Sequence, residues 1–320
     1  MSLIKNVLGH FSSATKYLGS LWQQINATLK SKWPTQHKKL CLYARLTRLD
    51  KPIGILLLLW PTLWGLWFAA EGPPYGSVFI VFCLGVLLMR SAGCVLNDIA
   101  DRQIDKHINR TEARPLTNGE IGAKEALLIA IALIFIAFLL VLTMNTFTVQ
   151  LAFVAVLLAG VYPFMKRHTY LPQFVLGLAF GWAIPMGFAA QTGAIPELAW
   201  ILLIANVLWS VVYDTMYAMV DREDDLKIGV KSTAILLDDA DRFIIAIIQF
   251  MVIFTLIMAG KRAEMGGLYY LGLFVGCGFF IYQLCLIWQR QKENCFKAFL
   301  NNNWFGFTVF IGIMLDYLMR

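Results

Sequence analysis

The feature that most constrains this chain is a succession of long stretches without a single charged residue. Such stretches cover residues 53–70, 72–89, 126–165, 171–196, 198–213, 243–260, 265–289 and 298–315. A bilayer core about 30 Å thick is crossed by roughly 20 apolar residues of helix. The stretch at 126–165 is too long for one span, and its polar residues at 143–146 divide it in two. The sequence therefore predicts nine transmembrane helices.

The composition excludes an ordinary soluble enzyme. Of the 320 residues, 59% are hydrophobic and 15% are charged, whereas about a quarter of a soluble domain is charged. The six cysteines form no CxxC pair and no cluster with histidine, so we expect neither a zinc site nor a disulfide framework. Lysine and arginine are sparse in the apolar stretches and dense outside them, where anionic lipid headgroups attract such side chains. No basic domain outside the membrane is available for a nucleic-acid partner.

The distribution of lysine and arginine predicts the orientation in the membrane. The first 51 residues hold nine basic side chains, and the links after the second, fourth, sixth and eighth helices hold 14 of the 27. The opposite side holds only Lys261, Arg262 and Arg320. Because basic residues are enriched in cytoplasmic segments, we expect the N-terminus in the cytoplasm and the C-terminus on the other side.

Residues 1–40 form a basic N-terminal segment ahead of an intramembrane domain at 41–320. Apolar side chains recur in this segment at helical spacing, at Leu18, Leu21, Trp22, Ile25 and Leu29. This spacing predicts an amphipathic helix on the membrane surface. A basic segment without acidic residues also describes a mitochondrial transit peptide, but this one is rich in lysine rather than arginine.

Most acidic residues gather in two windows, each at the predicted cytoplasmic end of a span. The windows 98–125 and 214–241 hold 14 of the 20 acidic residues. Residues four apart lie on one face of a helix. Side chains with this spacing therefore form two predicted stripes of oxygen ligands. The first consists of Asn97, Asp101 and Asp105, and the second of Asp221 and Asp225.

An intramembrane residue precedes each stripe by seven positions, Arg90 in one case and Asp214 in the other. The two sets therefore share a 7-then-4 spacing with an offset of 124 residues. This weak internal repeat predicts two pseudo-repeated halves of a helical bundle that face one site. An ionisable side chain within a span faces the protein interior by default, because exposure to lipid is costly. For Arg90, the alternative is a side chain that extends to the headgroups.

Carboxylates and an amide, without histidine or cysteine, favour a hard cation such as Mg²⁺. Basic side chains from the neighbouring links could complete a diphosphate site, namely Arg102, Arg110, Arg114, Lys166, Arg167, Lys227 and Lys231. The remaining acidic residues of the second window are expected to be solvated, namely Glu223, Asp224, Asp238, Asp239 and Asp241. A polar pocket at one face of an apolar bundle suits an amphiphile with a diphosphate head and a hydrocarbon tail.

A secondary transporter is the alternative from another class, since internal repeats and intramembrane charges occur in transporters. A translocation path would need polar groups through the depth of the membrane. Here both acidic clusters lie on one side, and the spans beyond them carry almost no charge. The distribution therefore favours an enzyme.

These residues resemble the UbiA superfamily of intramembrane prenyltransferases, whose hallmarks are NDxxDxxxD and DxxxD motifs. Both are complete here, at 97–105 and 221–225. The chain is most similar to the branch that acts on 4-hydroxybenzoate in ubiquinone biosynthesis. The similar segments are 50–67, 92–105, 110–116, 161–167, 181–186, 213–225, 231–236 and 295–304.

The resemblance implies nine helices around a central cavity, with Mg²⁺ holding a polyprenyl diphosphate. It implies that the two stripes are the metal and diphosphate ligands, with Asp98 as a cap or supporting residue. Tyr162 and Lys166 match a YxxxK pattern, with Arg167 next to them. Asp214 would orient a ligand or the allylic cation, and Arg90 would hold the carboxylate of an aromatic acid. Nearby aromatic rings are expected to serve packing rather than cation binding.

The expected reaction is transfer of the polyprenyl group to ring carbon 3 of 4-hydroxybenzoate. Another aromatic acceptor, such as 1,4-dihydroxy-2-naphthoate, remains an alternative within the same family. The expected partners are the two substrates and membrane lipid. The expected location is the bacterial inner membrane, with the mitochondrial inner membrane as the alternative.

Overall fold

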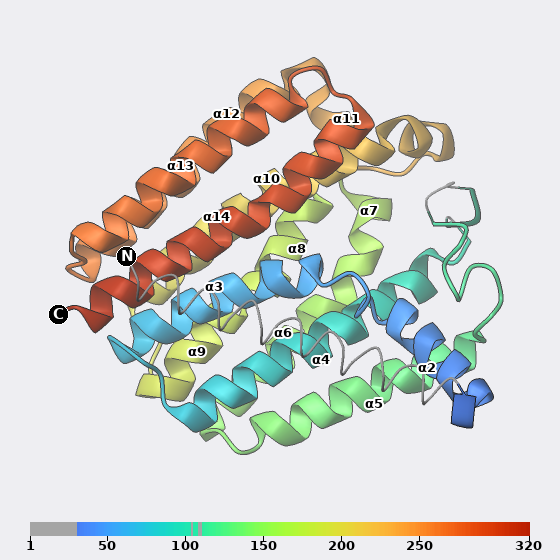
Figure 1. Ribbon diagram of the computed structural model, residues 1–320, viewed down its shortest axis with the longest axis horizontal. Coiled ribbons are helices and arrows are strands. Elements are labelled where there is room, and N and C mark those ends of the chain that lie inside the picture. Colours follow the sequence, from blue (N-terminus) through green and yellow to red (C-terminus); the bar gives the residue numbers. More distant parts are fainter. Residues whose placement is uncertain (1–30, 104, 108–110) are drawn as a thin grey trace.

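The computed structural model describes residues 31–103, 105–107 and 111–320 as a bundle of helices (Figure 1). All regular elements in these residues are helical, and nine helical spans are long and apolar enough to cross a membrane. The predicted all-α fold and number of spans are thus confirmed. In chain order the elements are α2 (Pro34–Leu46), α3 (Ile53–Ala70), α4 (Gly76–Asp101), η1 (Asp105–His107), α5 (Ala123–Val141), α6 (Thr146–Val161), η2 (Tyr162–Phe164), α7 (Met165–His168), α8 (Pro172–Gly181), α9 (Ala183–Thr192), α10 (Glu197–Ile228), α11 (Thr233–Leu237), η3 (Asp238–Ala240), α12 (Asp241–Arg262), α13 (Gly267–Ile287) and α14 (Lys292–Leu318).

Local chemistry explains where the spans are interrupted. The predicted break at 143–146 is present, and the Asn145 side chain caps α6 by accepting a hydrogen bond from the Thr148 amide. Proline lacks an amide hydrogen and clashes with the carbonyl four residues before it. Pro163 accordingly lies in the 3₁₀ turn η2 that ends α6, and Pro185 lies just after the break between α8 and α9. The first of these interruptions places Tyr162 at the end of its span.

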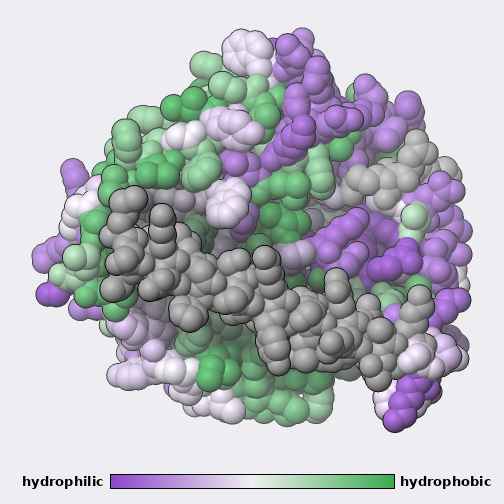
Figure 2. Space-filling view, viewed as in Figure 1, coloured by the Kyte–Doolittle hydropathy of each residue, from purple (hydrophilic) through white to green (hydrophobic). Residues whose placement is uncertain are grey.

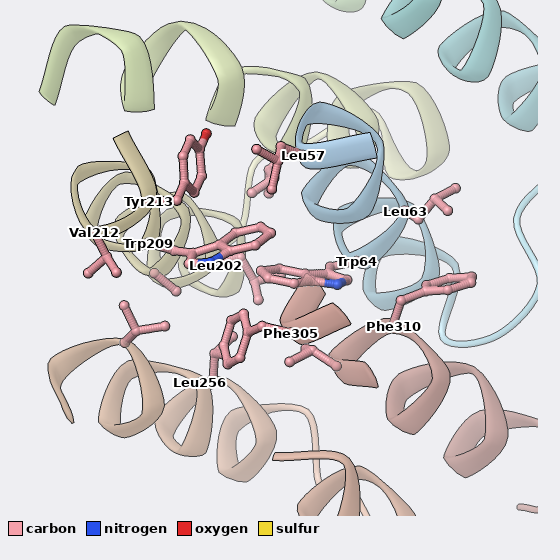
Figure 3. Packing of buried hydrophobic residues seen from close by; sticks show 14 of the residues in the cluster. Leu57, Leu63, Trp64, Leu202, Trp209, Val212, Tyr213, Leu256, Phe305 and Phe310 are labelled. Carbon is pink, nitrogen blue, oxygen red and sulfur yellow. The ribbon is translucent and has the colours of Figure 1, made fainter. Parts of the chain in front are cut away.

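Large buried aromatic side chains gather where α3, α10 and α14 meet. Trp64 and Trp209 stack with ring centroids 5.3 Å apart, and Phe305 packs beside both (Figure 3). Such aromatic contacts add to the stabilisation from apolar burial. Among the nine spans, α3 and α10 are the most buried within the protein, and α5 and α6 are among the least. The solid core therefore occupies one part of the bundle, and α5 and α6 form a thinner wall elsewhere.

One end of the bundle carries most of the polar groups. The α4–α5 link, α2, α7 and α11 lie at this end, and the C-terminus lies at the other (Figure 1). Hydrophilic side chains gather over the same end (Figure 2). The 32 residues of α10 rise about 48 Å at 1.5 Å per residue, more than the roughly 30 Å of a hydrocarbon core. The last turns of α10 therefore extend beyond the apolar layer.

The expected boundary between residues 40 and 41 falls inside α2. Leu46 at the end of α2 is buried with Val95 and Leu116, and the Tyr43 hydroxyl donates a 2.6 Å hydrogen bond to Glu125. This hydrogen bond raises the pKa of the Tyr43 phenol above its ordinary value. The amphipathic helix expected around residues 18–29 lies outside the described residues. Because residues 1–30 are not described, the division into 1–40 and 41–320 stays a prediction.

Candidate active site

The first acidic motif begins on α4 and continues beyond its end. Asn97 and Asp101 lie on α4, but the helix ends at Asp101 and Asp105 begins the separate 3₁₀ turn η1. The prediction of one continuous helical stripe was therefore wrong for Asp105. Arg114 explains the departure, because its guanidinium bonds both Asp98 inside the helix at 3.0 Å and Asp105 beyond it at 2.7 Å. These bonds hold the chain folded back at the helix end.

Basic side chains hold the carboxylates of this motif. Lys166 pairs with one oxygen of Asp101, and Arg48 donates hydrogen bonds of 2.9 and 3.0 Å to the two oxygens of Asp98. Arg48 lies in the link between α2 and α3. Asp98 is thus buried between Arg48 and Arg114, which corresponds to the supporting role that the resemblance left open for it.

The second acidic motif lies on α10 and faces the first. A polar cavity of about 160 Å³ is lined by four carboxylates from the two motifs and by Asp214, and the four are Asp101, Asp105, Asp221 and Asp225. Asn97, Arg114, Tyr162, Lys166 and Lys231 complete most of its polar wall. The structure therefore brings together residues that are more than 100 positions apart in the sequence.

A larger and mainly apolar cavity of about 740 Å³ adjoins the polar one. Its walls come from α3, α4, α5, α6, α8, α9, α10 and α14. Five residues line both cavities, namely Asn97, Arg114, Tyr162, Asp214 and Tyr217. An apolar chamber thus meets a polar, acid-lined pocket at one boundary. We refer below to the apolar chamber and the polar cavity.

Arg90 lies on the wall of the apolar chamber. Its Nε is buried and has no hydrogen-bond partner among the described residues, and the guanidinium lies 5.5 Å from the centre of the Phe180 ring. A Cβ atom on Gly54 would overlap this guanidinium, so glycine at that position makes room for it. Arg90 is also close enough to Asp214 to interact with it electrostatically. The side chain points into the protein rather than to the headgroups.

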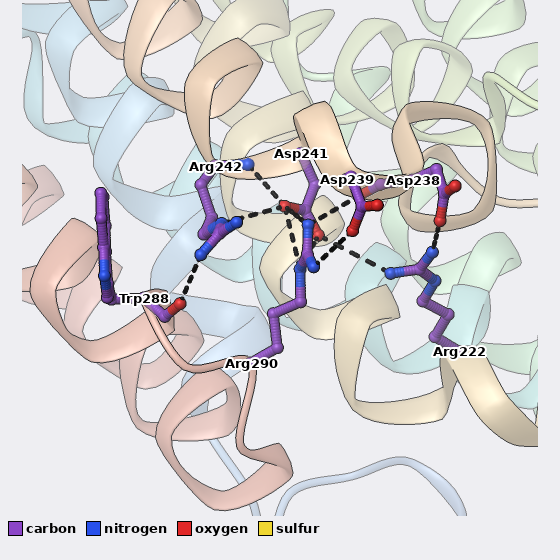
Figure 4. A network of polar contacts seen from close by, with 7 residues as sticks. All are labelled: Arg222, Asp238, Asp239, Asp241, Arg242, Trp288 and Arg290. Atoms are coloured by element: carbon purple, nitrogen blue, oxygen red, sulfur yellow. Dashed lines mark hydrogen bonds and ion pairs between the residues drawn. The ribbon is translucent and has the colours of Figure 1, made fainter.

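A network of ion pairs lies beside the second motif, around Arg222 of α10 (Figure 4). Arg222, next to Asp221, pairs with Asp238 and lies 4.0 Å from Asp241. Arg290 bonds Asp241 at 2.8 Å, and the hydrogen bonds with Asp241 raise the pKa of the Arg290 guanidinium. The network ties the end of α10 to the start of α12 and to the link before α14.

The expectation that all the remaining acidic residues of this window are solvated was wrong for Asp241. Its side chain is fully buried, because arginines from two other segments surround it. Asp238 and Asp239 are exposed as expected, although both form ion pairs. Glu223 is likewise exposed and pairs with Lys292.

The structure does not bring every predicted basic residue to the site. Within the described part of the chain, neither Arg167 nor Lys227 lines either cavity. The Arg167 guanidinium bonds the Ala100 carbonyl at the end of α4, and the Lys227 side chain is 73% exposed and pairs with Asp224. Arg110 lies outside the described residues.

Several polar side chains that the sequence did not single out also lie at the cavities, among them Arg48, Gln173 and Ser232. Arg48 lines the apolar chamber, and Gln173 and Ser232 line the polar cavity. Gln173 offered a signal, because it is a polar residue within an otherwise apolar span. Arg48 and Ser232 offered none, because their roles depend on the folding of short links.

The donors of the polar cavity fit a hard divalent cation. They are carboxylate and amide oxygens, which Mg²⁺ prefers, and Oδ1 of the buried Asp101 has no hydrogen-bond partner among the described residues. In the same part of the chain, no three acidic, histidine or cysteine side chains are gathered closely enough to hold a metal ion as they stand. Lys166 and Arg114 instead pair with Asp101 and Asp105.

Comparisons with known proteins agree on one family. The UbiA prenyltransferase family matches residues 58–310. A relative from Marinobacter nauticus, named 4-hydroxybenzoate octaprenyltransferase, is 56% identical over 88% of this chain and 96% of its own. A relative of the same name from Methylococcus capsulatus is 58% identical over 86% of this chain and 94% of its own.

Solved structures share the fold at low identity. An apo UbiA homolog from Aeropyrum pernix has a TM-score of 0.74 at 24% identity and covers 82% of this chain and 97% of its own. A UbiA homolog from Archaeoglobus fulgidus bound to GPP and Mg²⁺ has a TM-score of 0.63 at 18% identity and covers 87% of this chain and 100% of its own.

Proposed function

The chain belongs to the UbiA prenyltransferase family, and from this premise we propose how its two cavities carry out the reaction of its relatives. It is a membrane-embedded aromatic prenyltransferase that transfers a polyprenyl group from polyprenyl diphosphate to ring carbon 3 of 4-hydroxybenzoate, a step of ubiquinone biosynthesis. The observation that carries this proposal is the boundary where an apolar chamber of about 740 Å³ meets an acid-lined polar cavity. Relatives named 4-hydroxybenzoate octaprenyltransferase support the choice of acceptor.

The diphosphate occupies the polar cavity in this proposal. Asn97, Asp101, Asp105, Asp221 and Asp225 would hold Mg²⁺, which supplies positive charge to the leaving diphosphate. Basic side chains on the same wall bind phosphate oxygens directly, and they are Arg114, Lys166 and Lys231. Tyr162 lies at the boundary and reaches both substrates. Arg167 and Lys227 contribute only to the positive potential around this end.

The prenyl tail occupies the apolar chamber, where it replaces water. Departure of the diphosphate leaves an allylic cation, which water would quench, so a chamber that excludes water is a chemical requirement. Tyr213 and Tyr217 line this chamber and pack against Phe299, in agreement with the expectation that these rings serve packing. The ring of 4-hydroxybenzoate then attacks the cation through its carbon 3. The ring proton passes to Asp214 or to the released diphosphate.

Arg90 binds the carboxylate of 4-hydroxybenzoate. Its guanidinium has a buried nitrogen without a partner in the described chain, and a carboxylate is the partner that the fork of an arginine fits best. This pairing orients the ring toward the boundary between the cavities.

We further propose that the protein lies in a bacterial inner membrane with α2 and the polar cavity on the cytoplasmic side. The named relatives are bacterial, and the basic links gather at this end.

Purified protein tests the proposal. It is incubated in detergent with polyprenyl diphosphate and either 4-hydroxybenzoate or 1,4-dihydroxy-2-naphthoate, with and without Mg²⁺. The products are identified by mass spectrometry. We expect a Mg²⁺-dependent 3-polyprenyl-4-hydroxybenzoate. Prenylation of the naphthoate alone would keep the mechanism but reject the acceptor. An absence of both products would reject the proposal.

A further inference from the structure

The link between α10 and α11 forms one wall of the polar cavity. Val230, Lys231 and Ser232 all line it. The end of α4 contributes Asp101 to the same cavity. The proposal above assigns a function to Lys231 but leaves Ser232 without one.

Three hydrogen bonds hold the residues on both sides of Ser232, two through the backbone and one through a side chain. The Lys231 amide donates to the Lys166 carbonyl at 3.2 Å, which joins this link to the end of the fourth span. The Thr233 amide donates to Oε1 of Gln173 at 3.4 Å, and the Thr233 hydroxyl lies 2.6 Å from that of Thr215. A residue held between such anchors keeps a fixed position, because its neighbours on each side cannot shift independently.

The Ser232 hydroxyl is buried but not used by the protein. The residue is 4% exposed, and its Oγ has no hydrogen-bond partner among the described residues. Ser232 occupies the N-cap position of α11, where a serine hydroxyl usually accepts a hydrogen bond from the helix backbone. It makes no such side-chain cap bond here. A role in helix capping therefore does not explain the residue.

A buried hydroxyl without a partner is costly, so one on a cavity wall points to a ligand that supplies the missing bond. The ligand that the proposed function places in this cavity is a diphosphate, whose oxygens can accept a hydrogen bond from Ser232 and can contact the basic side chains of the same cavity, Arg114, Lys166 and Lys231. Hydrogen bonds to charged phosphate oxygens are shorter and stronger than those between neutral groups.

We propose that the Ser232 hydroxyl donates a hydrogen bond to a terminal phosphate oxygen of the prenyl diphosphate. This inference rests on the proposed function, because it assigns a further residue to the diphosphate subsite. The bond persists as the diphosphate leaves and gains charge, so it stabilises the departing group more than the bound substrate.

The test compares Ser232→Ala with Ser232→Thr, which keeps the hydroxyl and suits the extended backbone at this position. Ser91→Ala is the matched control, because it removes a buried hydroxyl from α4 that lines neither cavity in the described chain. For each variant, steady-state kinetics give kcat/KM for both substrates. Inhibition by inorganic pyrophosphate with Mg²⁺, and its direct binding by calorimetry, report on the diphosphate subsite alone.

We expect Ser232→Ala to lower kcat/KM for the prenyl diphosphate by about 10-fold to 100-fold, the usual worth of a hydrogen bond to a charged group. Pyrophosphate binding should weaken in the same variant, while its KM for 4-hydroxybenzoate stays near the wild-type value. In Ser232→Thr and Ser91→Ala, both kcat/KM and pyrophosphate binding should stay near the wild-type values. Unchanged pyrophosphate binding in Ser232→Ala, or an equal loss in Ser91→Ala, would overturn the inference. Wild-type protein that binds pyrophosphate through Ser232 but prenylates nothing would overturn the proposed function and support the inference.

Discussion

Replacing Arg90 with methionine should separate binding of the acceptor from every other step. Methionine keeps an apolar side chain of similar length on the wall of the apolar chamber but removes the guanidinium. An ion pair of this kind in a low-dielectric site is worth about 2–4 kcal/mol, which corresponds to roughly 30-fold to 700-fold in affinity. We therefore expect the KM for 4-hydroxybenzoate to rise by this factor, with little change in the KM for the prenyl diphosphate.

The matched assay uses 4-hydroxybenzamide, in which a neutral amide replaces the carboxylate in nearly the same shape. Rates of the wild type and of Arg90→Met are compared on both acceptors. If Arg90 binds the carboxylate, the variant loses activity on 4-hydroxybenzoate but little on the amide. An equal loss on both acceptors would contradict carboxylate binding by Arg90, because it would mean that Arg90 serves chiefly to balance the charge of Asp214.

A second variant reaches the same guanidinium without removing its charge. A Cβ atom at position 54 would overlap the Arg90 side chain, so Gly54→Ala should displace the guanidinium. We expect a smaller rise in the KM for 4-hydroxybenzoate than in Arg90→Met, and again little effect with the amide.

Three further predictions concern the scaffold, the chamber and the metal. Asp241→Asn should lower the free energy of unfolding by up to about 3 kcal/mol, because it removes the charge of a fully buried carboxylate that pairs with Arg290. Unfolding in detergent measures this free energy. The control is Asp239→Asn at an exposed position, which should change the free energy of unfolding by no more than about 0.5 kcal/mol. Equal losses in the two variants would contradict the prediction. Ala155→Phe should narrow the apolar chamber and shift preference toward shorter prenyl diphosphates, whereas Leu157→Phe on the exposed side of α6 should not. An unchanged chain-length profile in a competition assay would contradict this. Chelation of divalent cations should abolish prenylation and added Mg²⁺ restore it, whereas residual turnover in excess chelator would count against a metal-dependent site.

The number of spans could be predicted because the bilayer imposes a simple rule on the sequence. Each crossing needs a long apolar stretch, and polar residues at 143–146 interrupted the one stretch that held two. This rule says nothing of the charged ends of helices, which only the four-residue spacing of the acidic side chains predicted to be helical. Helix α10 continues to Ile228, well past the apolar stretch that ends at 213, because the acidic motif itself is helical.

The partners of individual charges could not be predicted in the same way. Asp241 is buried because Arg290, 49 positions away, lies beside it. Asp105 left the helical stripe because Arg114 pairs with it and with Asp98. Spacing within a helix identifies residues on one face, but ion pairs between segments depend on how the links fold. For the same reason, Lys227 and Lys231 looked alike in the sequence, and only Lys231 reaches the polar cavity.

The claim tested most directly is that the two acidic motifs share one metal and diphosphate site at the mouth of the apolar chamber. The measurement is a crystal structure of the protein with Mn²⁺, which stands in for Mg²⁺, and a prenyl thiodiphosphate that the enzyme cannot cleave. We expect anomalous Mn²⁺ peaks between Asp101 and Asp221, with the diphosphate in the polar cavity and the tail in the apolar chamber. Metal bound at only one motif, or a diphosphate outside the polar cavity, would contradict it.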